Sequence, residues 1–252
     1  KKPAVCWFFS VCVSRKAWAF GDGAVHRLVG WPLHLRPMPS SKSSRQSPSG
    51  NARKPDAKKP VHRAPKGPPS HEIRIIGGQW RRTRLKVIDK PGLRPTPDRV
   101  RETLFNWLGQ DLSGWRCVDA FAGTGVLGLE AASRGATHVL MVEQDAVLVR
   151  DLQENATRLK ASMVSVQRGD AVSTLGRLPA GSVDLVFIDP PFDGPWFEPA
   201  IKAAARAVPV GGWIYLEAPV SWPTEALTAL GLQCERHLKA GAVHAHLLRR
   251  IA

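Results

Sequence analysis

The chain has 252 residues and a formal net charge of +15, which suits one α/β domain with a basic appended segment. The charge is uneven: residues 1–71 carry a net +12, residues 72–108 carry +5, and residues 109–252 carry −2. A basic segment joined to a near-neutral domain indicates a polyanionic partner, most often nucleic acid. No apolar run reaches the roughly 18 residues that a membrane span requires, and none of the four cysteines lies in a metal-binding pattern.

Residues 1–71 predict a disordered basic tail. The stretch 39–71 is a low-complexity sequence of Ser, Lys, Arg and Pro, which cannot bury enough apolar surface to form a core. The stretch 1–37 begins with Lys1 and Lys2, followed by an apolar run and a small-x-small site at Ala17–Ala19, which is the outline of a signal peptide. Since the first Met is Met38, we interpret residues 1–37 as an artefact upstream of the natural start and expect a cytoplasmic protein.

Order is expected to begin near Ile73 with a small β-hairpin. Strands are predicted over 73–78 and 84–88, and the turn between them carries an arginine-rich rim. The next helix is expected to take Thr96 as its cap and Pro97 as its first residue. The apolar face of this helix consists of Leu104, Phe105 and Leu108.

From Cys117 onward, apolar strands alternate with helices. The strands are predicted over 117–121, 138–143, 164–170, 183–189 and 211–219. Helices are predicted over 125–135 and 145–160, shortly after 170, and over 196–208 and 224–230. Residues 232–251 form a predicted antiparallel pair. This order is typical of a mostly parallel sheet covered on both faces, with an antiparallel edge and a ligand site at the carboxyl ends of the strands.

A glycine-rich turn follows the strand that begins at Cys117. Gly123, Gly125 and Gly128 form the pattern G-x-G-x-x-G, and Glu143 ends the next strand 20 residues after Gly123. This spacing is typical of a nucleoside-binding loop, in which glycines let the backbone approach the ligand and the acid accepts from ribose hydroxyls. The alternative is that the glycines serve only the packing of helix against strand.

Asp119 distinguishes between the ligands that such a loop can bind. It lies four residues before Gly123, where it would repel a pyrophosphate and attract an ammonium group. S-adenosylmethionine has a ribose, an adenine and two cationic groups but no phosphate, so the sequence favours this cofactor. Asp170 is placed to accept from the adenine amino group, and Ala171 offers a backbone N–H to the ring. Phe121, inside the turn, completes the predicted cofactor set.

The strand over 183–189 ends in Asp-Pro-Pro-Phe, a rigid corner that two prolines deprive of backbone donors. The exocyclic amino group of a nucleobase is a weak nucleophile, because its lone pair is delocalised into the ring. The Asp189 carboxylate and the Pro190 carbonyl would accept from its two hydrogens, and Phe192 would stack on the base. Asp189 would also take the proton that the nitrogen loses, while alignment supplies most of the rate. The alternative is a proline turn with a capping Asp.

The corner and the glycine turn together resemble the amino-methylating S-adenosylmethionine-dependent methyltransferases. The segments RIIGGQWRRTRLKV and PGLRPTPDRVRETLFNWL further resemble the N-terminal region of RsmD, the bacterial 16S ribosomal RNA guanine-N2 methyltransferase family. The resemblance extends from about Ile73 to Ile251. It implies a Rossmann-like class I methyltransferase fold, with a seven-stranded, mostly parallel sheet, an antiparallel C-terminal hairpin and a small N-terminal β-hairpin.

The same resemblance implies a site and a substrate. The cofactor would be held by Asp119, Gly123, Gly125, Glu143 and Asp170. A guanine of 16S ribosomal RNA, in a small subunit or an assembly intermediate, would be held by Asp189, Pro190 and Phe192. The chain then divides into the tail over 1–71, an RNA-facing hairpin and helix over 72–108, and the methyltransferase domain over 109–252. We expect a monomer that binds neither a metal nor a membrane.

Basic side chains on the hairpin and the helix after it are expected to contact RNA phosphates. This set comprises Arg81, Arg82, Arg84, Arg94, Arg99 and Arg101, with Trp80 as a stacking ring. A guanine in structured RNA must also be unstacked before it enters a pocket. The alternative for each arginine is ordinary surface charge.

Three other functions are compatible with parts of this pattern. An adenine-N6 methyltransferase of DNA or RNA would use the same corner. A nicotinamide-dependent oxidoreductase would use the same glycine pattern but leaves the Asp-Pro-Pro-Phe corner unexplained. A non-catalytic RNA-binding protein would need none of the acids at the strand ends.

Overall fold

The computed structural model describes residues 70–93 and 95–252, and a seven-stranded sheet forms its centre. In spatial order the strands are β5 (Val164–Arg168), β4 (His138–Glu143), β3 (Arg116–Asp119), β6 (Leu185–Ile188), β7 (Trp213–Ala218), β9 (Val243–Arg250) and β8 (Leu232–Ala240). Strand β9 is antiparallel to both of its neighbours, and the other pairs are parallel. The predicted mostly parallel sheet with an antiparallel C-terminal hairpin is therefore confirmed. Residues 1–69 of the predicted tail, and Arg94, lie outside the described residues.

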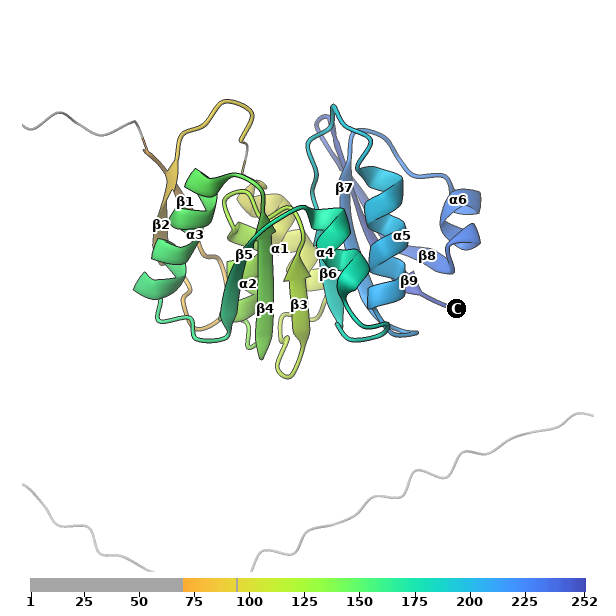
Figure 1. The fold of residues 1–252 in the computed structure, drawn as a ribbon, viewed down its shortest axis with the longest axis horizontal. Helices are drawn as coiled ribbons and strands as arrows, with labels where there is room; N and C mark the ends of the chain where they lie inside the picture. Colours follow the sequence, from red (N-terminus) through yellow and green to blue (C-terminus); the bar gives the residue numbers. More distant parts are fainter. Residues whose placement is uncertain (1–69, 94) are drawn as a thin grey trace, which may run out of the picture. The chain divides into compact units, whose positions relative to one another are not determined.

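Helices cover both faces of the sheet, as central parallel strands require. They are α1 (Asp98–Trp107), α2 (Val126–Ser133), α3 (Ala146–Arg158), α4 (Ala171–Arg177), α5 (Phe197–Ala207) and α6 (Thr224–Ala229). Helices α4 and α5 lie on one face, and α1 and α2 lie on the other (Figure 1). The first core is built around Leu175 and Ile201, and the second around Phe105 and Leu129. Among the described helices, none is long and apolar enough to cross a membrane.

A separate two-stranded hairpin, β1 (Ser70–Arg74) and β2 (Arg84–Ile88), packs against α3. Two side chains of α3 fix it through backbone carbonyls of β2. The Asn155 amide donates to the carbonyl of Lys86 at 3.2 Å, and the Arg158 guanidinium donates to that of Arg84 at 2.7 Å. The predicted N-terminal hairpin is confirmed, although β1 begins at Ser70 rather than at Ile73.

The turn after β1 is held by Glu130 on α2. Its carboxylate accepts from the backbone N–H groups of Ile76 at 2.6 Å and of Gly77 at 3.3 Å. Backbone hydrogen bonds continue past β1 only as far as Ile75, whose N–H donates to the Thr83 carbonyl at 2.9 Å. Since the Gly77 N–H is directed at the helix, the pairing stops short of the predicted Gly78.

Arg101 is a structural residue, and the prediction that it contacts RNA is wrong. Its side chain is fully buried and forms an ion pair with Glu130, with Nη1 and Oε1 at 2.7 Å. Its Nε donates to the Thr96 carbonyl at 3.1 Å, and its Nη1 also donates to the Arg74 carbonyl at 3.0 Å. Position 101 falls on the same helical stripe as the apolar residues of α1, which explains why it faces inward.

Thr96 does not cap α1, contrary to the prediction. The helix begins at Asp98, after Pro97, and the Pro97 carbonyl accepts from the N–H of Val100 at 3.0 Å. The Thr96 side chain is buried and instead hydrogen-bonds the carboxylate of Glu217 on β7. The predicted apolar face of α1 is confirmed, since all three of its residues are buried.

Replacing Arg101 with Ala is expected to lower the free energy of unfolding by about 3–5 kcal/mol, because it removes the closest ionic partner of the buried Glu130 carboxylate. Arg99 lies two positions away on the exposed side of α1, and Arg99→Ala should change stability by less than about 0.5 kcal/mol. Urea unfolding of both variants measures the difference. Equal losses in the two variants would contradict a buried structural role for Arg101.

Candidate functional site

Three carboxylates lie at the carboxyl ends of the neighbouring strands β3, β6 and β7. The register aligns Asp119 with Phe187 and Phe187 with Tyr215, so these side chains share one face. Asp189 and Glu217 follow two positions after Phe187 and Tyr215, at the next level of the same face. The strand order changes direction between β3 and β6. Parallel sheets bind their ligands at such a point, beyond the carboxyl ends of the strands.

Burial shifts these acids toward their protonated forms. It raises the pKa of Asp119 to about 7, and the nearby Glu143 carboxylate contributes to the rise. Burial also raises the pKa of Asp189 well above its usual range, and the charges of Glu217 and Asp119 raise it further. A cation beside these acids would favour their ionised forms, so this edge of the sheet suits a cationic ligand. No group of three or more His, Cys, Asp or Glu in the described residues is arranged to hold a metal ion.

The glycine turn leads from β3 into α2 in a left-handed conformation. Gly125 has a φ of +73°, and a Cβ there would lie 2.3 Å from Cδ2 of Leu152, so a side chain is excluded on two grounds. The Gly128 N–H donates to Oδ2 of Asp119 at 2.9 Å. The glycines thus pack the turn against its neighbours, as the alternative proposed, and also leave Gly123 partly exposed at the sheet edge.

Glu143 and Asp170, two of the acids predicted to bind the cofactor, also support the backbone around the turn. Glu143 accepts from the N–H groups of Gly123 and Asp145, both at 2.9 Å. Asp170 caps α4 by accepting from the N–H of Ser173 at 2.7 Å. Both acids remain partly exposed at the carboxyl edge of the sheet. Of the other residues in the predicted set, Phe121 is partly exposed and Ala171 is buried at the start of α4.

The connection between β2 and α1 contacts the carboxyl edge of the sheet at two places, near the glycine turn and at the end of β7. Lys90 forms an ion pair with Asp145, the residue that caps α3. Cδ1 of Leu93 lies 3.2 Å from the point where a Cβ on Gly123 would stand. Six residues after Lys90, the Thr96 hydroxyl reaches the carboxylate at the end of β7. The connection therefore spans the edge from the glycine turn to β7.

The Asp-Pro-Pro-Phe corner follows β6 and presents an aromatic ring. Phe192 is 42% exposed, while Pro190 is buried and anchors the corner. The Phe192 ring lies 6.2 Å from that of Phe197, which lies 6.4 Å from that of Trp222. A cavity of about 210 Å³ lies beside the last two rings. A partly exposed ring next to the half-buried Asp189 carboxylate can bind a flat group that carries hydrogen-bond donors.

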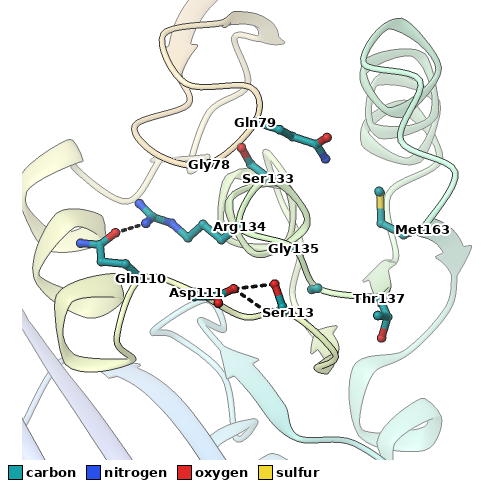
Figure 2. A pocket seen from close by; sticks show the side chains of 11 residues that line it. Gly78, Gln79, Gln110, Asp111, Ser113, Ser133, Arg134, Gly135, Thr137 and Met163 are labelled. Carbon is teal, nitrogen blue, oxygen red and sulfur yellow. Dashed lines mark hydrogen bonds between the residues drawn. The ribbon is translucent and has the colours of Figure 1, made fainter. Parts of the chain in front are cut away.

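A cavity of about 620 Å³ lies at the opposite edge of the sheet (Figure 2). Its lining includes Ser113, Thr137 and Met163, which come just before β3, β4 and β5. Arg134, which also lines it, is directed at Gln110 and forms an ion pair with Glu130. Since ligands of parallel sheets bind at the carboxyl ends, we place the candidate site at the other edge.

The predicted RNA-binding residues differ in exposure. The exposed members are Arg81, Arg82, Arg84 and Arg99. Arg84 forms a surface ion pair with Glu72 at 2.9 Å. Trp80 is partly buried and packs against the core, which leaves only part of its ring for stacking. Apart from Arg101, the described members of this set thus surround the hairpin turn and the start of α1.

Glu217 was not predicted as a site residue. It is 4% exposed, and it lies in the run of apolar residues that predicted β7. An acid inside such a run is the signal that could have identified it, because charged residues are seldom buried without a partner or a function. Its contact with Thr96 depends on the fold and has no sequence signal.

Comparison with known proteins places this geometry in a family. A family model described as conserved hypothetical protein 95 matches residues 73–249. Ribosomal RNA small subunit methyltransferase D of Escherichia coli K12 is 42% identical over 173 residues, which are 69% of this chain and 82% of that protein. The protein of the same name from Haemophilus influenzae is 42% identical over 136 residues, or 52% of this chain and 69% of that one.

Two solved structures have the same fold. A protein from Escherichia coli described as a methyltransferase matches with a TM-score of 0.63 and 36% identity, over 72% of this chain and 99% of that one. A Haemophilus influenzae protein described as a methylase gives a TM-score of 0.60 and 32% identity, over 72% and 100%. The fold and the glycine turn define a class I methyltransferase, an enzyme that uses S-adenosylmethionine. Within that class, the chain belongs to the ribosomal RNA small subunit methyltransferase D family.

Proposed function

We propose that the protein transfers a methyl group from S-adenosylmethionine to the exocyclic N2 amino group of a guanine in 16S ribosomal RNA. The observation that carries the proposal is the meeting of the glycine turn, the clustered acids and the Asp-Pro-Pro-Phe corner at one edge of the sheet. The printed names of the relatives support ribosomal RNA of the small subunit as the substrate. The choice of guanine N2 rests on the sequence resemblance described above.

The residues at the ends of β3, β4 and β5 fit the cofactor. S-adenosylmethionine supplies an electrophilic methyl group on a sulfonium sulfur, which keeps the electron pair of the broken carbon–sulfur bond. Asp119 is buried and would ionise beside the cationic groups, and Glu143 would accept from the ribose. Asp170 and Ala171 would bind the adenine. The glycine turn, with Gly123, Gly125 and Phe121, would let the backbone approach the ligand.

The corner after β6 would bind the guanine. Asp189 and the Pro190 carbonyl would accept from the two hydrogens of the amino group, and Phe192 would stack on the ring. Asp189 would then accept the proton that N2 loses as the new carbon–nitrogen bond forms. Because burial and nearby acids raise its pKa, this carboxylate is a stronger base than an exposed aspartate.

The hairpin and the start of α1 would bind the RNA around the target nucleotide. The residues proposed for this role are Trp80, Arg81, Arg82, Arg84, Arg94 and Arg99. Phosphate contacts of exposed arginines are screened by salt, so affinity for RNA should fall as salt concentration rises. The substrate would be a small subunit or an assembly intermediate, bound in the cytoplasm by one copy of the chain.

The experiment that tests this function is transfer of a labelled methyl group to 30S particles, free 16S RNA and DNA. Transfer to the particles or to the free RNA is expected. An adenine-N6 methyltransferase of DNA would use the same corner, so label in DNA but in neither RNA substrate would overturn the proposal.

Asp119 makes the affinity for the cofactor depend on pH. Its pKa is about 7 in the free protein, so below about pH 7 the carboxyl group must lose a proton before it can face a cation. S-adenosylmethionine affinity is therefore expected to fall as pH drops through 7, by up to about tenfold per pH unit. Calorimetric titration in buffers of different ionisation enthalpy measures both the affinity and the proton release. Asp119→Asn should bind more weakly at high pH and lose this dependence; an unchanged slope would exclude Asp119 as its source.

Replacing Asp189 with Asn is expected to abolish methyl transfer, because the amide cannot accept the proton from N2. The affinity for S-adenosylmethionine should stay within several-fold of the parent value, because the variant keeps the glycine turn and Asp119. Labelled transfer and a cofactor titration measure the two quantities. Full transfer by the variant would overturn the role proposed for Asp189.

A further inference from the structure

Glu217 is a buried acid for which the function proposed above gives no role. It lies on β7, beside Asp189, which directly follows β6, because the register aligns Leu216 with Ile188. Its carboxylate accepts from the Tyr215 hydroxyl at 2.8 Å and is also hydrogen-bonded by the side chain of Thr96. A charged group at this depth lowers stability unless hydrogen-bond donors compensate for its burial. A buried acid that lowers stability is therefore a candidate for a functional role.

The charges and donors around Glu217 come from three neighbouring elements. Asp189 approaches from the end of β6, and the charge of Asp119 on β3 acts on Asp189 in turn. Tyr215 lies on β7 itself, and Thr96 belongs to the connection before α1. Burial raises the pKa of Glu217, and the hydrogen bonds from the two hydroxyl groups oppose that rise. When Glu217 is ionised, its charge in turn opposes the ionisation of Asp189.

We propose that Glu217 is a positioning residue for methyl transfer, and that its carboxylate, held by Tyr215 and Thr96, sets how readily Asp189 accepts a proton. The proposal rests on the function proposed above, in which Asp189 takes the proton from N2. Glu217 itself is too deeply buried to contact the base, so it acts through Asp189.

The proposed role of Glu217 concerns the proton that N2 loses during the reaction. The bond from N2 to the methyl carbon forms as the carbon–sulfur bond breaks, with its electron pair left on sulfur, and N2 then loses one proton to the Asp189 carboxylate. A negative charge beside Asp189 stabilises the protonated product of that step. Since Asp189 and Glu217 interact, they titrate as a pair. The pH dependence of the rate should therefore follow the titration of the pair and not that of an isolated aspartate.

Thr96 connects Glu217 to the buried ion pair of Arg101 and Glu130. The Arg101 guanidinium donates to the Thr96 carbonyl at 3.1 Å, and Arg101 is itself fixed by the buried pair with Glu130. The hydroxyl of Thr96 is therefore placed by the same contacts that hold the hairpin turn. In this way the connection before α1 fixes Glu217 in place as well as covering the glycine turn.

The test is the pH profile of the single-turnover rate on 30S particles, over the range in which the particles stay intact. The rate of the parent protein should rise with pH as the pair loses a proton. Glu217→Gln removes the charge but keeps an oxygen that can accept from Tyr215. At the pH where the parent reaches half of its maximal rate, this variant should run close to its own maximum. Glu225→Gln, the same change at an exposed position of α6, should keep the parent profile.

Two further variants test how Glu217 is held. Tyr215→Phe and Thr96→Val each remove one donor that favours the ionised form of Glu217. Both should therefore shift the profile in the same direction as Glu217→Gln, by a smaller amount. Thr96→Ser, which restores a hydroxyl, should return the parent profile. If Glu217→Gln fails to fold in urea unfolding tests, these variants carry the test alone.

The outcomes separate this inference from the function on which it rests. If Asp189→Asn still transfers methyl groups, the proposed role of Asp189 fails, and the inference fails with it. If Asp189→Asn is inactive but Glu217→Gln and Thr96→Val keep the parent profile, only the inference is overturned. Loss of maximal rate without any shift of the profile would mean that Glu217 is structural, and it also overturns the inference.

Discussion

The in-phase pairing of β3, β6 and β7 brings three acids to one face at the carboxyl edge of the sheet, and the proposed chemistry depends on it. A shift of one residue in any of these strands would turn its acid to the other face. The pairing is secured by the apolar strands themselves, since every residue of β6 is buried. The glycine turn and the Asp-Pro-Pro-Phe corner follow β3 and β6 directly, so they meet at this edge.

The clustered acids oppose folding in the free protein, because loss of solvent and mutual repulsion disfavour their ionised forms. A cationic ligand would relieve that repulsion, so its binding would stabilise the folded protein. Under the proposed function, the same repulsion would make Asp189 a better proton acceptor. The basic hairpin, by contrast, is attached to the domain by the buried pair of Arg101 and Glu130, so the surface proposed to bind RNA and the candidate site share one support.

The sequence predicted the order of strands and helices because apolar runs and turn residues mark them locally. It also predicted Asp119 and Asp189 at the sheet edge, since both directly end apolar strands. The errors arose where a contact joins distant segments. Arg101 has the residue type of an RNA contact, but its helical position turns it toward Glu130. Thr96 has the pattern of a cap, but its hydroxyl bonds a carboxylate far along the chain.

The most direct test of this account is to identify the nucleoside that the enzyme makes. Small-subunit ribosomal RNA that the protein has methylated would be digested to nucleosides and analysed by mass spectrometry. A corner that holds an exocyclic guanine amine against the methyl donor predicts N2-methylguanosine as the new product. Finding N6-methyladenosine in its place, or a methyl group on a ribose or a ring carbon, would contradict the account.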